Sequence, residues 1–126
     1  MPDLIKLLIV DDSLIIRKSI QKYLDGYNIN VVGIAGDGKS ALKIFKDQMP
    51  DVVTLDITMP EMDGLTVLEE MLKIRDDTKI MVVTALSDKA TGLKAIKLGA
   101  KGFLPKPFSA EQLKESFTRL IGYKNK

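Results

Sequence analysis

Polar side chains follow four short apolar runs of this 126-residue chain, at the point where each run ends. They are Asp11 and Asp12 after residues 7–10, Asp56 after 52–55, Thr84 after 80–83 and Lys106 soon after 102–104. Short apolar runs bounded by Gly, Pro or Asp predict buried strands. Because ligands of parallel α/β sheets bind at the carboxyl ends of the strands, we expect these side chains to line one site.

The three aspartates determine what this site could bind. At roughly 4 Å, two carboxylates repel by about 1 kcal/mol in water and by about 4 kcal/mol at an effective dielectric of about 20, so the group needs a cation or protons. Oxygen ligands alone suit Mg²⁺, which is often shared with a phosphate. An aspartate can accept a phosphoryl group as a nucleophile, and a lysine and a hydroxyl can bind its oxygens. The pattern predicts a magnesium-dependent phosphoryl-accepting site centred on Asp56, with Lys106 and Thr84 beside it.

Each of these residues also has a structural interpretation when it is taken alone. The aspartates could cap a helix or a loop, Thr84 could be structural, and Lys106 could be an ordinary surface lysine. Phe103 could be a core residue. The joint arrangement favours function, because each polar residue falls at the end of a different predicted strand.

Composition excludes several kinds of chemistry. The chain has no cysteine and no histidine, which removes disulfides, thiol catalysis, imidazole bases and the metal ligands that these residues provide. No signal-peptide pattern begins the chain and no run is apolar enough to span a bilayer, so we expect a cytoplasmic protein without membrane insertion.

Charge is unevenly distributed along the chain. Residues 1–87 carry 10 basic and 14 acidic side chains, whereas residues 88–126 carry 9 basic and 3 acidic ones. The basic part is either solvated helix surface or a surface for an acidic partner. Direct binding of nucleic acid is disfavoured, because no aromatic residues interleave with the lysines.

Apolar runs alternate with amphipathic stretches along the chain, which predicts an α/β fold. Helices are expected in five stretches, at about 14–24, 39–48, 65–75, 89–98 and from 110 onward, with Ser13 and Ser109 as N-caps. Right-handed crossovers and the order 2-1-3-4-5 predict a doubly wound, flavodoxin-like parallel sheet of five strands with helices on both faces. That order places the first and third strands side by side and gathers the aspartates. No linker interrupts the pattern, so residues 1–126 are expected to form one domain.

The predicted helix at about 89–98 differs from the others. Its apolar face is the thinnest, and Thr91 and Gly92 lower its helix propensity. We expect it to be the most mobile helix.

In combination, the motifs resemble the receiver domain of bacterial two-component response regulators, above all its stand-alone chemotaxis members. The resemblance covers essentially the whole chain and rests on Asp11-Asp12-Ser13, the loop 56–64, Thr84-Ala85 and Lys106-Pro107-Phe108. It implies a signalling domain that catalyses only its own phosphorylation and dephosphorylation.

The resemblance also assigns roles to the site residues. Asp56 would be phosphorylated by the phosphohistidine of a CheA-like histidine kinase. Mg²⁺ would be bound by Asp12, Asp56 and the backbone carbonyl of Thr58, with Asp11 acting through water. Lys106 would contact the phosphoryl group, and its peptide bond to Pro107 would be cis.

A conformational switch is a further implication of the resemblance. Thr84 would move toward the phosphoryl group, and Phe103, the aromatic residue three positions before the lysine, would turn inward. The readout face would be the fourth helix, fifth strand and fifth helix, whose lysines are Lys89, Lys94, Lys97, Lys101 and Lys114. We therefore expect a monomer whose partner is acidic and amphipathic, such as a peptide of the flagellar motor switch, with a phosphatase as a further partner.

Two residues depart from the familiar pattern of the family. Phe103 lacks the hydroxyl of the more familiar tyrosine, so a hydrogen bond from that hydroxyl to a partner is unavailable. Pro105, near the end of the fifth predicted strand, removes a ladder donor, which is tolerable if that strand lies at an edge.

Other functions remain open from the sequence. The chain could be a receiver cut from a larger regulator with a DNA-binding or methylesterase domain. An aspartate-nucleophile phosphohydrolase is an enzyme alternative, but Thr58 stands where its second acid belongs. A flavodoxin-type flavin module would want a Ser/Thr-rich phosphate loop in place of Asp11-Asp12. A purely structural interaction domain would leave the aspartates without a role.

Overall fold

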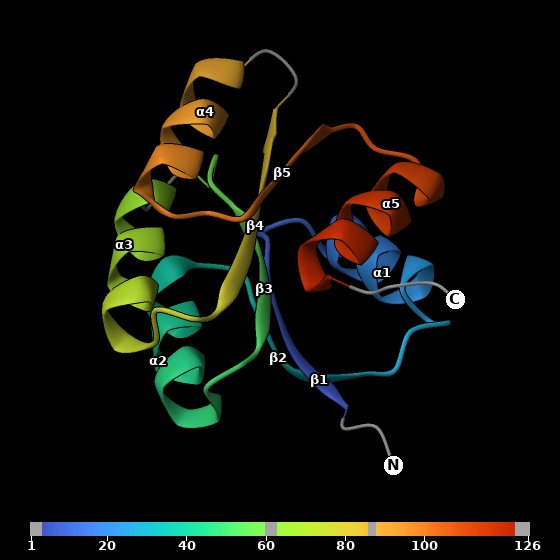
Figure 1. The fold of residues 1–126 in the computed structure, drawn as a ribbon, viewed down its shortest axis with the longest axis horizontal. Coiled ribbons are helices and arrows are strands. Elements are labelled where there is room, and N and C mark those ends of the chain that lie inside the picture. Colours follow the sequence, from blue (N-terminus) through green and yellow to red (C-terminus); the bar gives the residue numbers. More distant parts are fainter. Residues whose placement is uncertain (1–3, 60–62, 86–87, 123–126) are drawn as a thin grey trace.

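A computed structural model describes residues 4–59, 63–85 and 88–122 and shows strands and helices alternating along the chain (Figure 1). The strands are β1 (Ile5–Val10), β2 (Ile29–Ala35), β3 (Val52–Asp56), β4 (Lys79–Ala85) and β5 (Gly102–Lys106). The helices are α1 (Leu14–Tyr23), α2 (Gly38–Gln48), α3 (Gly64–Ile74), α4 (Lys89–Leu98) and α5 (Ala110–Ile121). Every predicted element is present, with ends that differ from expectation by one or two residues. None of the described helices is long and apolar enough to cross a membrane.

The five strands form one sheet in the order β2-β1-β3-β4-β5, and every neighbouring pair is parallel. This confirms the predicted fold class and strand order. Helices α1 and α5 cover one face of the sheet, and α2, α3 and α4 cover the other (Figure 1). Val10 of β1 is paired with Leu55 of β3. The ends of these two strands therefore lie side by side, at the point where the strand order reverses.

The central strands are buried on both faces of the sheet, which explains why they read as continuous apolar runs. All of β3 is buried. One hydrophobic cluster, here called the α2–α3–α4 layer, includes Phe45, Val53 and Leu68. The other, the α1–α5 layer, includes Ile20 and Phe117. The central strands are thus held between two layers of helices, and their carboxyl ends are fixed by the packing beneath them.

Short polar side chains set where the helices begin. The Ser13 hydroxyl accepts the backbone N–H three residues along at 3.3 Å, and Ser109 forms a reciprocal capping box. Both predicted N-caps are therefore confirmed. Asp37 and Asp63 cap α2 and α3 in the same way, and these two helices begin one residue earlier than expected.

Helix α4 packs on the sheet through small residues. Gly92 and Ala95 are its buried residues, whereas Leu93 is 61% exposed and Ile96 is 40% exposed. The thin apolar face expected from the sequence is confirmed. The mobility of this helix stays a prediction.

Strand β5 runs two residues farther than expected, through Pro105 to Lys106. It lies at the edge of the sheet, with β4 as its neighbour. An edge strand tolerates proline because one side of its backbone needs no ladder partner. The longer strand carries Lys106 to the same edge of the sheet as the ends of β1 and β3.

Candidate functional site

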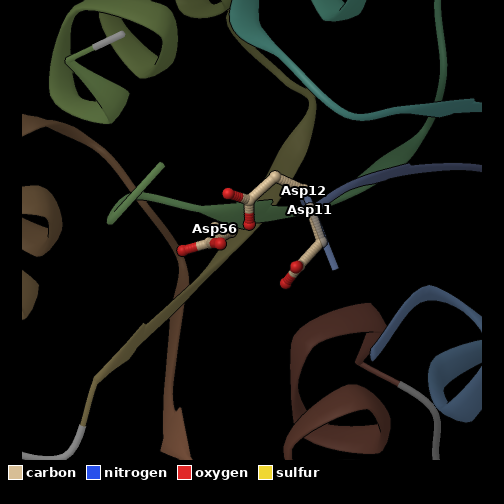
Figure 2. Close-up of side chains that lie close together, drawn as sticks. All are labelled: Asp11, Asp12 and Asp56. Atoms are coloured by element: carbon tan, nitrogen blue, oxygen red, sulfur yellow. The ribbon is translucent and has the colours of Figure 1, made fainter. Parts of the chain in front are cut away.

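The ends of β1 and β3 bring three carboxylates together, as Figure 2 shows. Asp11 and Asp12 follow the last residue of β1, and Asp56 is the last residue of β3. One carboxylate oxygen from each lies within 4.8 Å of the others. Asp11 is 1% exposed and Asp56 is 2% exposed, while Asp12 is open to solvent. We call these three residues the acidic cluster.

Lys106 closes the cluster from the end of β5. Its Nζ lies 3.0 Å from Asp11 Oδ2 and 3.2 Å from Asp56 Oδ2. Burial by itself would lower the pKa of Lys106, but the hydrogen bonds and charges of Asp11 and Asp56 outweigh burial, and the pKa is raised. The side chain is therefore an ammonium ion at neutral pH. The following peptide bond, Lys106–Pro107, is cis, as the resemblance implied.

The surroundings of Asp11 shift the pKa of its carboxyl group. Burial raises its pKa, the backbone N–H of Ser13 at 2.9 Å and the ammonium of Lys106 lower it, and the charge of Asp56 raises it again. The net result is a raised pKa. The cluster holds three carboxylates, and Lys106 pairs with two of them, so a surplus of negative charge remains. A hard cation with oxygen ligands would remove that surplus, and the donor set fits Mg²⁺.

Asp56 is held in place by the residue two positions along the chain. Its Oδ1 accepts the Thr58 backbone N–H at 2.9 Å and the Thr58 hydroxyl at 2.7 Å. Its Oδ2 faces Lys106. The resemblance implied a role for Thr58 only through its carbonyl, and the contact of its hydroxyl was not predicted. An Asp followed two residues later by Thr is the pattern of a local side-chain turn, and this signal could have found the contact.

The two predicted switch residues make contacts with the N-cap of α4 and with the hydrophobic core. Thr84 is buried in β4, and its hydroxyl donates to the backbone carbonyl of Asp88 at 3.5 Å. Phe103 of β5 is half-buried and packs against the α2–α3–α4 layer. Of the predicted site residues, the structure thus brings together Asp11, Asp12, Asp56, Thr58 and Lys106. It places Thr84 and Phe103 on the adjoining strands β4 and β5.

Comparison with known proteins agrees with this geometry. The family profile of the response regulator receiver domain matches residues 7–118. The chemotaxis protein CheY of Thermotoga maritima is 37% identical over 115 residues, covering 91% of this chain and 96% of that protein. A probable transcriptional regulator, ycf27 of Guillardia theta, is 41% identical over 121 residues, which cover 96% of this chain and 47% of that protein.

A solved structure shows the same fold. The CheX–CheY–BeF3–Mg²⁺ complex from Borrelia burgdorferi superposes with a TM-score of 0.86 at 29% identity. The match covers 93% of this chain and 89% of that chain. The chain belongs to the response regulator receiver family. It is therefore a signalling domain and not a classical enzyme, which sets aside the phosphohydrolase reading.

Proposed function

We propose that this chain is a phospho-acceptor switch in which Asp56 receives a phosphoryl group from the phosphohistidine of a histidine kinase. The observation that carries the proposal is the position of Asp56, with Lys106 on one side and the other two carboxylates beside it. A carboxylate oxygen would attack phosphorus, the P–N bond would break, and the imidazole would leave with that electron pair. The acyl phosphate would then rest within reach of the lysine ammonium.

The acidic cluster is proposed to hold Mg²⁺ while this reaction occurs. Asp12, Asp56 and the backbone carbonyl of Thr58 would be ligands, with Asp11 acting through water. When bound, Mg²⁺ neutralises charge on the transferring phosphoryl group. The amide and hydroxyl of Thr58 hold one oxygen of Asp56 and so orient the carboxylate. Lys106 supplies a point charge for the phosphoryl oxygens, and Thr84 can donate its hydroxyl once it leaves the Asp88 carbonyl.

The readout is proposed to lie on α4, β5 and α5. Leu93 and Ile96 of α4 are exposed, and five exposed lysines lie on α4, on α5 and just before β5; they are Lys89, Lys94, Lys97, Lys101 and Lys114. Such a surface suits a partner that is acidic and amphipathic, and we propose a peptide of the flagellar motor switch. The proposed protein is a single-domain cytoplasmic monomer, which a phosphatase would reset.

A receiver within a larger regulator is the second candidate. The chain spans about half of the Guillardia theta regulator that it matches, whereas it spans nearly all of the Thermotoga maritima protein. In that case the same phosphorylation would act on an attached DNA-binding or methylesterase domain. The site chemistry is the same for both candidates, and only the output differs.

The mass of the intact protein after treatment with acetyl phosphate tests the phosphorylation. We expect the wild type to gain one phosphoryl group in the presence of Mg²⁺ and none in the presence of a chelator. Asp56→Asn removes the nucleophile and should gain nothing, whereas Asp25→Asn, at an exposed position outside the cluster, should behave as the wild type. A folded wild type without an adduct would overturn the proposal.

The output face has a test of its own. Binding of a fluorescent acidic, amphipathic peptide of a motor switch protein should weaken as salt rises, because screening removes the attraction between its charges and the lysines. Lys97→Glu should weaken binding, and Lys39→Glu, at an exposed position of α2, should change it little. Equal effects of the two variants would argue against this face.

A further inference from the structure

A glycine in α4 makes room for the aromatic ring of β5. Gly92 is buried, and a Cβ built on it would lie 2.0 Å from Cε1 of Phe103 and 2.6 Å from its Cδ1. No real Cβ comes so close to a ring carbon. The Phe103 ring therefore occupies the space that any side chain at position 92 would need.

The helix turn that carries Gly92 also holds the site threonine. The Gly92 backbone N–H donates to the carbonyl of Asp88 at 3.4 Å, and the Thr84 hydroxyl donates to the same carbonyl at 3.5 Å. Both distances are long compared with the usual value of about 2.9 Å, so both bonds are weak. The Asp88 side chain adds no capping hydrogen bond to this turn. The Asp88 N–H donates to the Ala85 carbonyl at 2.9 Å, so one bond of normal length and two long ones hold this turn above the ring.

The sheet fixes the ring and the threonine on one side. Phe103 is paired with Val82, and Thr84 lies two residues farther along β4. Residues two apart on a strand point to the same face, so Thr84 and the ring both face the α4 side. A continuous set of contacts thus runs from the Phe103 ring through Gly92 and the Asp88 carbonyl to the Thr84 hydroxyl.

We propose that Gly92 is a positioning residue that couples the Phe103 ring to Thr84, and through Thr84 to the Asp56 site. The ring and the first turn of α4 fit together only because position 92 has no side chain. A methyl group there would displace the ring or the turn, and a displaced turn would move the carbonyl that holds Thr84. The coupling to Asp56 rests on the proposed phosphoryl-accepting function; the packing of the ring on Gly92 does not.

The packing is tested by a double-mutant cycle on urea unfolding. In a helix interior, alanine is intrinsically favoured over glycine. We expect Gly92→Ala to lower the unfolding midpoint when Phe103 is present and to raise it in a Phe103→Ala background. Thr91→Ala, the neighbouring change in α4, should act alike in both backgrounds. If Phe103→Ala does not fold, Phe103→Leu replaces it and should reduce the loss caused by Gly92→Ala.

A midpoint that Gly92→Ala raises equally in both backgrounds would overturn the packing.

The coupling is tested by Mg²⁺-dependent titration with beryllofluoride, followed through the backbone NMR signals of Thr84 and Asp88. We expect Gly92→Ala to weaken the apparent affinity for beryllofluoride about fivefold or more. Adding Phe103→Ala to the same protein should restore that affinity. Thr91→Ala should leave the affinity unchanged.

The outcomes separate the two proposals. Gly92→Ala could shift the unfolding midpoint in opposite directions in the two backgrounds, as expected, and yet leave the beryllofluoride affinity unchanged. The ring would then pack on Gly92 without coupling to the site, and the inference would be wrong. If the wild type binds no beryllofluoride, the proposed function fails and the coupling fails with it. The unfolding cycle then still decides the packing.

Discussion

Thr54 places an unpaired hydroxyl group in the middle of the central strand. It is 0% exposed, its Oγ1 has no hydrogen-bond partner among the described residues, and its strand neighbours are Ile9 and Met81. A buried hydroxyl without a partner costs about 1–3 kcal/mol. We predict that Thr54→Val raises the free energy of unfolding by about 1 kcal/mol, as measured by urea denaturation.

Thr78 provides the matched control for Thr54. It is equally buried, but its hydroxyl donates to the carbonyl of Pro50 at 3.2 Å. Thr78→Val removes the hydroxyl and with it this hydrogen bond to the Pro50 carbonyl, so we expect the variant to be less stable than the wild type. A loss of stability in both variants would show that the Thr54 hydroxyl has a partner in solution.

Single residues of the site differ in how well the sequence predicts them. The acidic cluster and Lys106 follow from strand ends, because burial fixes the strands and the topology fixes which ends meet. The hydroxyl contact of Thr58 and the bond from Thr84 to Asp88 depend on loop conformation and side-chain rotamers. A hydrophobic pattern carries no information about either.

At the scale of elements, the N-cap of α2 contributes a pH-dependent part of the stability. Asp37 accepts the Ser40 N–H at 2.8 Å and the Ser40 hydroxyl at 3.2 Å. These bonds favour the carboxylate, with the backbone bond the larger cause, and lower the pKa of Asp37 below its ordinary value of 3.8. The stabilisation is therefore complete above that value and is lost as the pH falls through the lowered pKa of the folded state.

We predict that Asp37→Ala lowers the melting temperature at neutral pH and that the difference from the wild type narrows below about pH 4. Thermal melts across this pH range measure the effect. Ser109→Ala removes an uncharged cap from α5, so the melting temperature that it loses relative to the wild type should be the same at every pH. A pH-independent deficit in Asp37→Ala would mean that the charge of the cap does not matter.

Elements are predicted better than their ends. Strands and helices differ in the period of their apolar residues, and that period is visible along the whole chain. The ends depend on local hydrogen bonds. A Gly-Asp-Gly sequence reads as a turn, yet Asp37 caps a helix there. Pro105 reads as the end of a strand, yet an edge position lets β5 continue to Lys106.

At the scale of the whole molecule, the fold order followed from general rules of α/β proteins. Alternating strands and helices require parallel pairing, and right-handed crossovers place helices on both faces. The order β2-β1-β3-β4-β5 is the doubly wound arrangement that these rules allow. The packing of the Phe103 ring on Gly92 could not be predicted in this way, because it depends on how closely one helix approaches one strand.

The central strand couples the two hydrophobic layers. Val52 belongs to the α1–α5 layer, and Val53 belongs to the α2–α3–α4 layer. Loss of either layer would expose one face of the same strand. We therefore expect unfolding to be a single cooperative transition in which neither layer survives alone.

This expectation can be measured because tyrosine fluorescence reports on one layer, whereas far-UV circular dichroism reports on the backbone of the whole molecule. Tyr23 and Tyr27, two of the three tyrosines, pack against the α1–α5 layer, and the chain has no tryptophan, so fluorescence in a Tyr123→Phe background reports on that side. Phe45 is fully buried in the opposite layer.

We predict that Phe45→Leu destabilises the protein by about 1–2 kcal/mol and shifts the urea midpoints of fluorescence and far-UV circular dichroism together. Phe117→Leu, within the α1–α5 layer, should shift both signals in the same manner. A fluorescence midpoint that Phe45→Leu leaves unchanged, while the circular dichroism midpoint falls, would show that the two layers unfold separately.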